Sequence, residues 1–111
     1  MPLRLLALTL LLSLPPLPAK ATVLDFYPNP VPGNQAHLRW VPEAPATLTL
    51  SLFNSAGRFL GSQSRHAQGV TQTLDLDLRP LARGVYFWQA QVQADASPTL
   101  STHWGKFAVY R

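Results

Sequence analysis

Residues 47–58 read Thr-Leu-Thr-Leu-Ser-Leu-Phe-Asn-Ser-Ala-Gly-Arg. Leucine alternates with a hydroxyl residue through the first six positions, so one side of an extended chain is apolar and the other is polar. Asn54 then begins a four-residue turn that ends at Gly57, the position that needs a positive φ. The stretch therefore predicts a half-buried strand, a tight turn and the start of a second antiparallel strand.

The same period of two recurs through the chain after residue 36, and no stretch has a convincing helical period. The expected strands cover residues 36–41, 47–53, 58–62 or a little more, 70–78, 85–94 and 99–110. In the last of these, the apolar parity changes between Trp104 and Phe107, which predicts a β-bulge near Gly105. Six to seven short strands at this spacing predict a small antiparallel immunoglobulin-like β-sandwich.

Apolar residues at alternate positions define the expected core faces. They are Leu38 and Trp40; Leu48, Leu50 and Leu52; Leu74, Leu76 and Leu78; and Tyr86, Trp88, Ala90 and Val92. Between Phe26 and Asn34, three prolines at alternate positions hold the chain extended and remove three backbone donors. That segment is expected along a sheet edge or leading into the first strand, and it is unsuited to a central strand.

Residues 1–21 have the features of a secretory signal peptide. Arg4 supplies the positive charge, Leu5 to Leu14 form an apolar run, and Ala19-Lys20-Ala21 is a small-x-small cleavage site. The run is too short to span a bilayer, although an uncleaved anchor is the alternative. We expect a signal peptide over 1–21, a β-sandwich domain over 22–111, and no transmembrane segment after cleavage.

Composition excludes several classes of protein. A chain of 111 residues forms one small domain at most. Without Arg4 and Lys20 the net charge falls from +4 to +2, and the remaining cations form no basic stripe, so we expect no nucleic-acid partner. The absence of cysteine excludes disulfides, thiolate zinc sites and a cysteine nucleophile.

Histidines and carboxylates form the first candidate chemical site. His37, His66 and His103, with Asp75 or Asp77, have the side chains needed for a metal or acid–base site. Their spacing follows no ligand or catalytic motif, which favours the alternative of separate, solvated histidines. The two aspartates share one sheet face, but they alone would leave Ca²⁺ short of oxygen ligands. We therefore expect no metal, no cofactor and no enzymatic activity.

Aromatic residues form the second candidate site. The three tryptophans with two tyrosines would suit a platform for sugar rings, although large aromatics in so small a sandwich usually fill the core. This set is Trp40, Trp88, Trp104, Tyr27 and Tyr86. Phe53, Phe59 and Phe87 do not fit the core parity of their strands, so one or more of them is expected to mark a contact surface.

Four elements, in order, resemble the type A C-terminal sorting domain of the type IX secretion system, also called the Por secretion system. They are Tyr27-Pro28-Asn29-Pro30; residues 47–58; Leu74-Asp75-Leu76 leading to Leu78-Arg79-Pro80-Leu81-Ala82-Arg83-Gly84-Val85-Tyr86-Phe87; and Lys106-Phe107-Ala108-Val109-Tyr110-Arg111. The resemblance covers residues 27–111, and related secreted immunoglobulin-type modules share much of it.

The resemblance implies a route. Such proteins cross the inner membrane by the general secretory pathway, the outer-membrane translocon then recognises the folded sorting domain, and a sortase removes it from typical cargo. The expected localisation is the periplasm in transit, then the cell surface or the extracellular space. Only Thr22 to Phe26 stand between the leader and the first motif, so the domain itself is the product or the reading frame is a fragment of a longer cargo protein.

The resemblance also implies recognition residues. They are Tyr27, Pro28, Asn29, Pro30, Gly57, Gly84, Val85, Tyr86, Lys106 and Arg111. The two prolines of the first motif would fix the chain path, the two glycines would supply turn geometry, and Tyr86 would anchor the core with its hydroxyl at the rim. The basic residues would guide a partner toward the apolar closing strand. The alternative function is a periplasmic or extracellular binding module for glycan or protein, unrelated to sorting.

Overall fold

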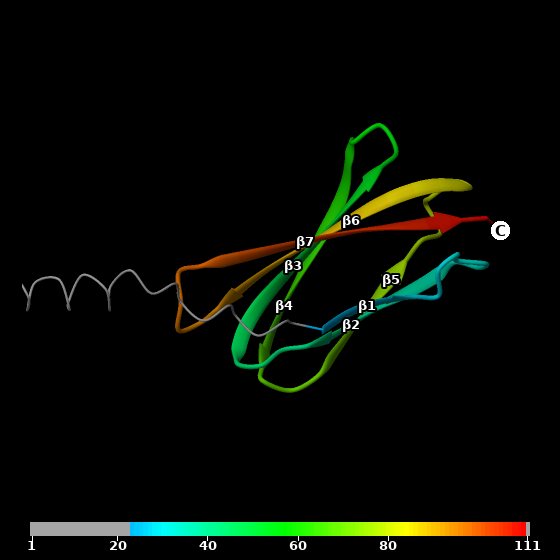
Figure 1. Ribbon diagram of the computed structural model, residues 1–111. Helices are drawn as coiled ribbons and strands as arrows, with labels where there is room; N and C mark the ends of the chain where they lie inside the picture. Colours follow the sequence, from blue (N-terminus) through cyan, green and yellow to red (C-terminus); the bar gives the residue numbers. More distant parts are fainter. Residues whose placement is uncertain (1–22, 111) are drawn as a thin grey trace, which may run out of the picture.

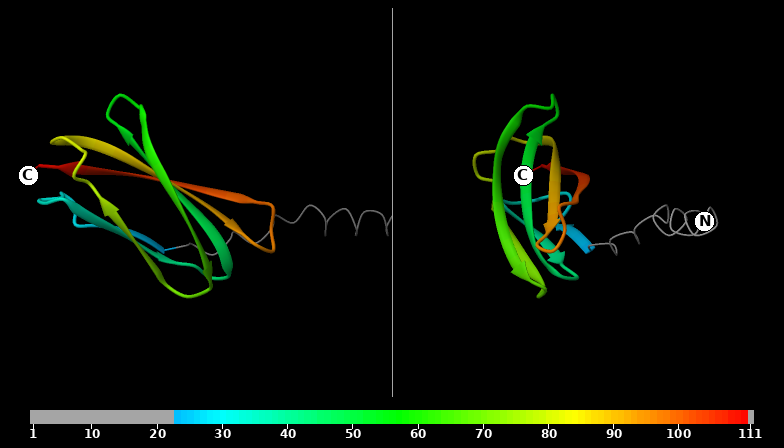
Figure 2. Two further views of the ribbon diagram at one scale, coloured as in Figure 1. Left: turned by 180° about the vertical axis from the view of Figure 1, so that it is seen from behind. Right: turned by 90° about the vertical axis from the view of Figure 1, so that its left-hand side faces the viewer.

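Two antiparallel sheets pack face to face in the computed structural model, which describes residues 23–110 (Figure 1). The seven strands are β1 (Val23–Tyr27), β2 (Gln35–Val41), β3 (Pro45–Asn54), β4 (Phe59–Gln68), β5 (Gln72–Asp77), β6 (Gly84–Ala94) and β7 (Leu100–Val109). One sheet has the order β1-β2-β5 and the other the order β4-β3-β6-β7. The predicted β-sandwich is confirmed, and Figure 2 shows its two layers from behind and from one end.

The core lies between the sheets and is supplied by alternate residues of the central strands. All the predicted core positions are buried except Leu52, which packs against the core while partly exposed. The largest fully buried side chains are Trp40, Phe107, Leu38, Leu48, Leu50, Leu74, Leu78, Val31 and Val109. The period of two in the sequence thus corresponds to one face turned inward on each strand.

The proline-rich segment carries the chain from one sheet to the other. β1 lies at the edge of the three-stranded sheet, beside β2. After the cis prolines Pro28 and Pro30, Val31 forms a parallel bridge with Val109 at the β7 edge of the four-stranded sheet. The segment therefore lies along sheet edges, as predicted.

The predicted bulge near Gly105 is wrong. The pairing of β6 with β7 runs without a register shift from Gly84–Val109 to Gln93–Leu100. Gly105 faces the core, and the indole ring of Trp88 on the neighbouring strand fills the space that its side chain would take. The apolar parity changes because Leu100 and Trp104 point outward, where they are exposed.

Two further differences concern strand limits. β1 begins at Val23, before the proline segment, and β4 extends to Gln68, well past residue 62. β4 is an edge strand in which Gly61 and polar residues interrupt the apolar alternation, so its length leaves a weak signal in the sequence. The turn between β3 and β4 is confirmed, because the Asn54 side chain accepts from the amides of Ala56 and Arg58, and Gly57 has a φ of 84°.

Candidate recognition site

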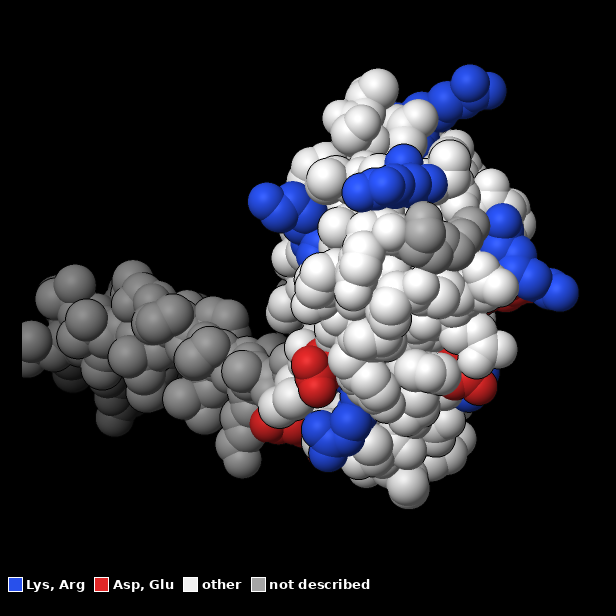
Figure 3. Space-filling model, turned by 90° about the vertical axis from the view of Figure 1, so that its right-hand side faces the viewer, with Lys and Arg blue, Asp and Glu red and all other residues white. Residues whose placement is uncertain are grey.

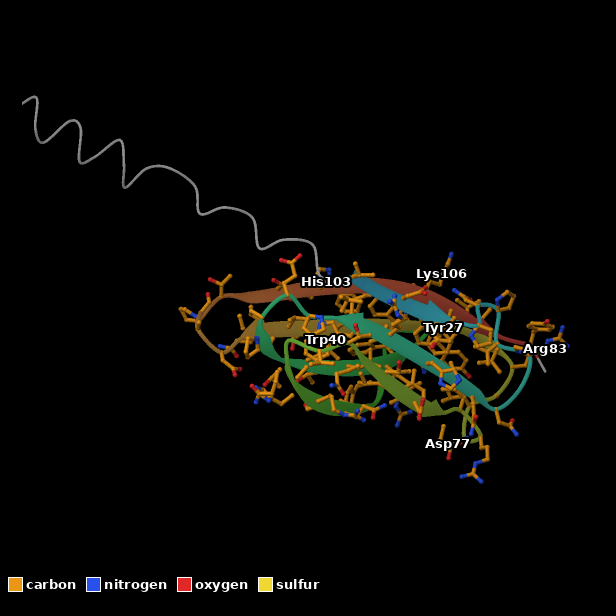
Figure 4. The ribbon with its side chains drawn as sticks, turned by 90° about the horizontal axis from the view of Figure 1, so that it is seen from below. Tyr27, Trp40, Asp77, Arg83, His103 and Lys106 are labelled. Atoms are coloured by element: carbon orange, nitrogen blue, oxygen red, sulfur yellow. The ribbon has the colours of Figure 1, made fainter. Side chains whose placement is uncertain are left out.

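Most of the recognition residues implied by the sequence meet at one end of the sandwich. Asn29 joins the first motif to the closing strand, since its Nδ2 donates to the carbonyl of Lys106 at 2.9 Å. Its Oδ1 accepts from the amide of Ala108 at 3.3 Å. The side-chain amide of Asn29 thus takes the place of a peptide group of a neighbouring strand. Figure 4 shows Tyr27 and Lys106 on neighbouring parts of this end.

Val31 extends the same contact by its backbone. Its amide donates to the carbonyl of Ala108 at 2.7 Å, and its carbonyl accepts from the amide of Tyr110 at 3.2 Å. Residues 29 and 31 therefore provide hydrogen-bond partners for backbone groups at the end of β7, on the strand edge that does not pair with β6. We call the contact of Asn29 and Val31 with β7 the edge clamp.

Tyr86 closes the core beneath the edge clamp. Its ring stacks on Phe107 at 5.5 Å between centroids, and Phe107 stacks in turn on Phe26 at 4.6 Å. Its hydroxyl donates to the carbonyl of Ala82 at 2.6 Å, which ties the loop before β6 to the core. A phenol suits this place because its body is apolar and its hydroxyl finds an acceptor at the rim.

The remaining recognition residues are placed as follows. Val85 pairs with Ala108 and is exposed, and Gly84 opens β6 opposite Val109 with a φ of 159°. Gly57 lies in the β3–β4 turn, away from the edge clamp. Arg111 lies outside the described residues.

A shallow, open hollow of about 720 Å³ lies beside the first motif. It is lined by Pro28, Pro32, Gly33, Asn34, Gln35, His37, Asp77 and Arg79. Within it, Arg79 Nη2 lies 2.6 Å from Asp77 Oδ2, and hydrogen bonds from the Arg79 side chain and backbone lower the pKa of Asp77 from 3.8 to about 2. The hollow therefore presents a carboxylate that stays ionised at all ordinary pH values.

The histidines do not form a common site. His37 pairs with Asp75 at 2.8 Å on the outer face of the three-stranded sheet, whereas His66 pairs with Asp95 at 2.8 Å at the far end of β4. His103 lies on β7, with a buried Nε2 that has no hydrogen-bond partner among the described residues. Residues 23–110 contain no group of three side chains able to hold a metal ion. The three histidines therefore lie separately, as the alternative prediction had it.

The five aromatic residues form no common platform, and three of them fill the core, as the alternative for so small a sandwich predicted. Trp40, Trp88 and Tyr86 are buried in the core, while Tyr27 and Trp104 are exposed on different sheets. One of the phenylalanines that broke the core parity is exposed, as predicted: Phe59 lies on the outer face, where Phe53 contacts it. Their role as a contact surface stays a prediction. No helix among the described residues is long and apolar enough to cross a membrane.

Comparison with models of known protein families shows to which family the chain belongs. Residues 25–99 match the family described as secretion system C-terminal sorting domain. The match begins within β1 and ends in the loop before β7, so it includes strands of both sheets. The protein belongs to this family. Membership in this family implies interaction with the type IX secretion machinery and export toward the cell surface or the extracellular space.

Comparison with solved structures confirms the fold of the sorting domain. It is similar to part of dimeric latent PorU from Porphyromonas gingivalis, with a TM-score of 0.67 and 17% identity over 81% of this chain. The match spans only 9% of that PorU chain. It is also similar to CopC from Methylosinus trichosporium OB3b, with a TM-score of 0.60, 19% identity, and 81% and 94% of the two chains covered. A comparison with curated protein sequences found no match.

The sequence did not reveal the edge clamp or the Tyr27–His37–Asp75 row. In that row the ring of Tyr27 lies 5.3 Å from that of His37, which bonds Asp75. Both features join residues far apart in the chain, and strand register alone brings them together. An asparagine between two prolines was the only local signal for the clamp.

Proposed function

We propose that the protein is a non-enzymatic, immunoglobulin-like export module whose sorting domain is itself the exported product. A signal peptide over residues 1–21 would take it into the periplasm by the general secretory pathway. The outer-membrane translocon would then recognise the folded domain, and a sortase is a candidate further partner. The observation that carries this proposal is the family match over residues 25–99.

The recognition surface in this proposal is the rim of the edge clamp. Pro28, Asn29 and Pro30 are exposed there, and Lys106 is exposed on the strand that they cover. Asn29 and Val31 give this rim a fixed backbone path. A partner would therefore read a rigid surface that exists only when both ends of the domain are folded.

The first experiment locates the protein in its native host. We would fractionate cells with and without a working type IX translocon and measure the intact mass of the protein. Appearance at the surface or in the medium only with the translocon would support the proposal, and the mass would show whether residues 22–111 survive. A periplasmic protein of that mass in both strains would contradict it.

A second experiment tests the rim. Deleting residues 106–111 would remove Phe107 and Val109 from the core, so loss of export would then report unfolding. Lys106→Glu reverses an exposed charge and leaves those core residues in place. We expect export to fall at least tenfold for Lys106→Glu and to be unchanged for Arg65→Glu, an exposed charge reversal on β4. Equal export of the two variants, with equal melting temperatures, would contradict recognition at Lys106.

A binding module unrelated to sorting is the second candidate. Exposure of Trp104 favours it, because a large exposed aromatic suits a contact surface. Burial of Trp40 and Trp88 counts against a broad sugar platform. Translocon-independent retention in the periplasm would move this candidate to first place.

A further inference from the structure

Three aromatic side chains from three strands meet on the outer face of the four-stranded sheet. Phe53 on β3 lies 5.9 Å from Phe59 on β4 and 5.6 Å from Trp104 on β7, measured between ring centroids. Trp104 is 59% exposed and Phe59 is 56% exposed. Single exposed aromatics are common on protein surfaces, but a contiguous group that faces away from the core calls for a function.

Strand register extends this group. Phe87 on β6 stands opposite Phe53, and Val85 lies two residues before it on the same face. Val85 is itself exposed. We call the set Phe53, Phe59, Val85, Phe87 and Trp104 the aromatic face. It crosses all four strands of the sheet at the end that carries the β3–β4 turn.

Cations accompany the aromatic face. Lys106 stands opposite Phe87 in the β6–β7 register, so it lies within the aromatic row. Arg58 directly precedes Phe59 in the β3–β4 turn, and Arg83 directly precedes the start of β6. Positive residues therefore lie within this apolar surface and beside its ends.

Carboxylates lie elsewhere. All five acidic residues are described: Asp25, Asp75 and Asp77 on the three-stranded sheet, Glu43 between β2 and β3, and Asp95 after β6. Asp95 pairs with His66, seven residues along β4 from Phe59, a distance of about 23 Å in a strand. In Figure 3, Lys and Arg predominate in the upper part of the molecule and the Asp and Glu lie in the lower part.

This combination disfavours two kinds of partner. A second copy of the chain would bring its own Lys106 and Arg58 against those of the first, which opposes self-association. A flat sugar platform needs rings in one plane, whereas the Phe53 ring is tilted by 40° to that of Trp104 and by 64° to that of Phe59. An apolar surface with cations and without carboxylates is complementary to a surface that is anionic outside and apolar beneath.

We propose that the aromatic face binds the surface of an anionic phospholipid membrane. Trp104 and Phe59 enter the headgroup region, where tryptophan is favoured because its ring is apolar and its indole N–H finds acceptors. Lys106 and Arg58 lie against the lipid phosphates, each adding attraction that salt screens. The contact is peripheral, and it shares only Lys106 with the edge-clamp rim through which the translocon is proposed to act.

Vesicle binding by the purified protein tests this. The probes are vesicles of phosphatidylcholine alone and of phosphatidylcholine mixed with phosphatidylglycerol. Co-sedimentation gives the affinity, and tryptophan emission reports insertion, because Trp40 and Trp88 are buried and Trp104 alone of the three tryptophans is exposed. We expect binding to the anionic vesicles, a blue shift of the emission, and weakening of both by high salt.

Two variants and one control identify the surface. Phe59→Ser with Trp104→Ser should lower the affinity for anionic vesicles at least tenfold, and Arg58→Glu should lower it severalfold and reduce its salt dependence. Val70→Ser is the matched control, because Val70 is 64% exposed but lies between β4 and β5, outside the aromatic face. It should bind as the original protein does. Thermal unfolding would verify that the variants fold, and Arg58→Glu keeps the test open if the double variant does not.

Three results would overturn the proposal: no binding to anionic vesicles, equal binding to neutral vesicles, or unchanged binding by both variants. If vesicles are not bound but the double variant, while folded, loses export in the host, the aromatic face docks on a protein and the lipid proposal is wrong. The vesicle assay contains no translocon. A failure to bind vesicles therefore does not contradict the proposed export function, and a failure of export does not contradict binding to vesicles.

Discussion

Gly105→Ala is the sharpest test of how the closing strand packs. Gly105 faces the core opposite Trp88, and a methyl group there would overlap the indole at Cε2, Cζ2 and Nε1. The ring cannot yield as a flexible side chain would, because it is rigid, 8% exposed and stacked at 6.1 Å on Phe26. Either β7 must move away from β6 or the ring must leave its place.

Both responses lower the free energy of unfolding. Overpacking of a core costs about 1–3 kcal/mol, and complete loss of a buried tryptophan costs about 3–5 kcal/mol. We therefore expect Gly105→Ala to cost about 2–4 kcal/mol, a large part of the stability of so small a domain. The melting temperature should fall by about 10–25 °C.

Urea unfolding followed by far-ultraviolet circular dichroism measures this without relying on the tryptophan signal. The matched control is Gly61→Ala on β4, where a Cβ would meet no atom within 4 Å. That change should alter the free energy of unfolding by no more than about 0.5 kcal/mol. If Gly105→Ala unfolds at the same urea concentration as Gly61→Ala, the packing of Trp88 over Gly105 is refuted.

Three further predictions concern single contacts. Tyr86→Phe removes the hydrogen bond to the Ala82 carbonyl and should lower the free energy of unfolding by about 1–2 kcal/mol in urea; no change would show that the bond adds nothing. Asn29→Ala opens the edge clamp and should speed amide exchange in β7 more than in β3; uniform exchange would contradict the clamp. Asp77 should titrate at about pH 2 by NMR and move toward 3.8 in Arg79→Gln; because its folded pKa is depressed, the stability due to this pair is present above about pH 4 and is lost as the pH falls toward 2. An unmoved pKa in Arg79→Gln would show another cause.

The alternation of apolar and polar residues predicts the fold wherever one face of a strand is exposed to solvent. Leu48 and Leu50 on β3, and Trp88 and Ala90 on β6, are buried as their spacing predicts. Alternation fails on β7, because Trp104 is large and apolar yet points outward, while Gly105 points inward. The space at Gly105 is filled by a residue 17 positions earlier in the chain. No pattern within β7 contains that information.

The candidate recognition site was likewise predictable only in part. The sequence identified Tyr27 to Pro30, Tyr86 and Lys106 as one recognition set, and the structure brings them to one end of the sandwich. Gly57 lies apart, because it serves the β3–β4 turn. The hydrogen bonds of Asn29 span 77 and 79 positions, so they became visible only once β7 was placed beside the first motif.

The edge clamp gives the domain a way to register whether its synthesis was completed. Asn29 leaves the ribosome early, but the carbonyl and amide that it binds arrive nearly eighty residues later. A product that stops before β7 would lack Phe107 and Val109, leave Phe26 and Tyr86 without their stacking partner, and expose the free edge of β6. We expect such a truncated chain to be more open to proteases than the complete one, in which the rim is closed. A receptor that reads this rim would thereby accept only finished molecules.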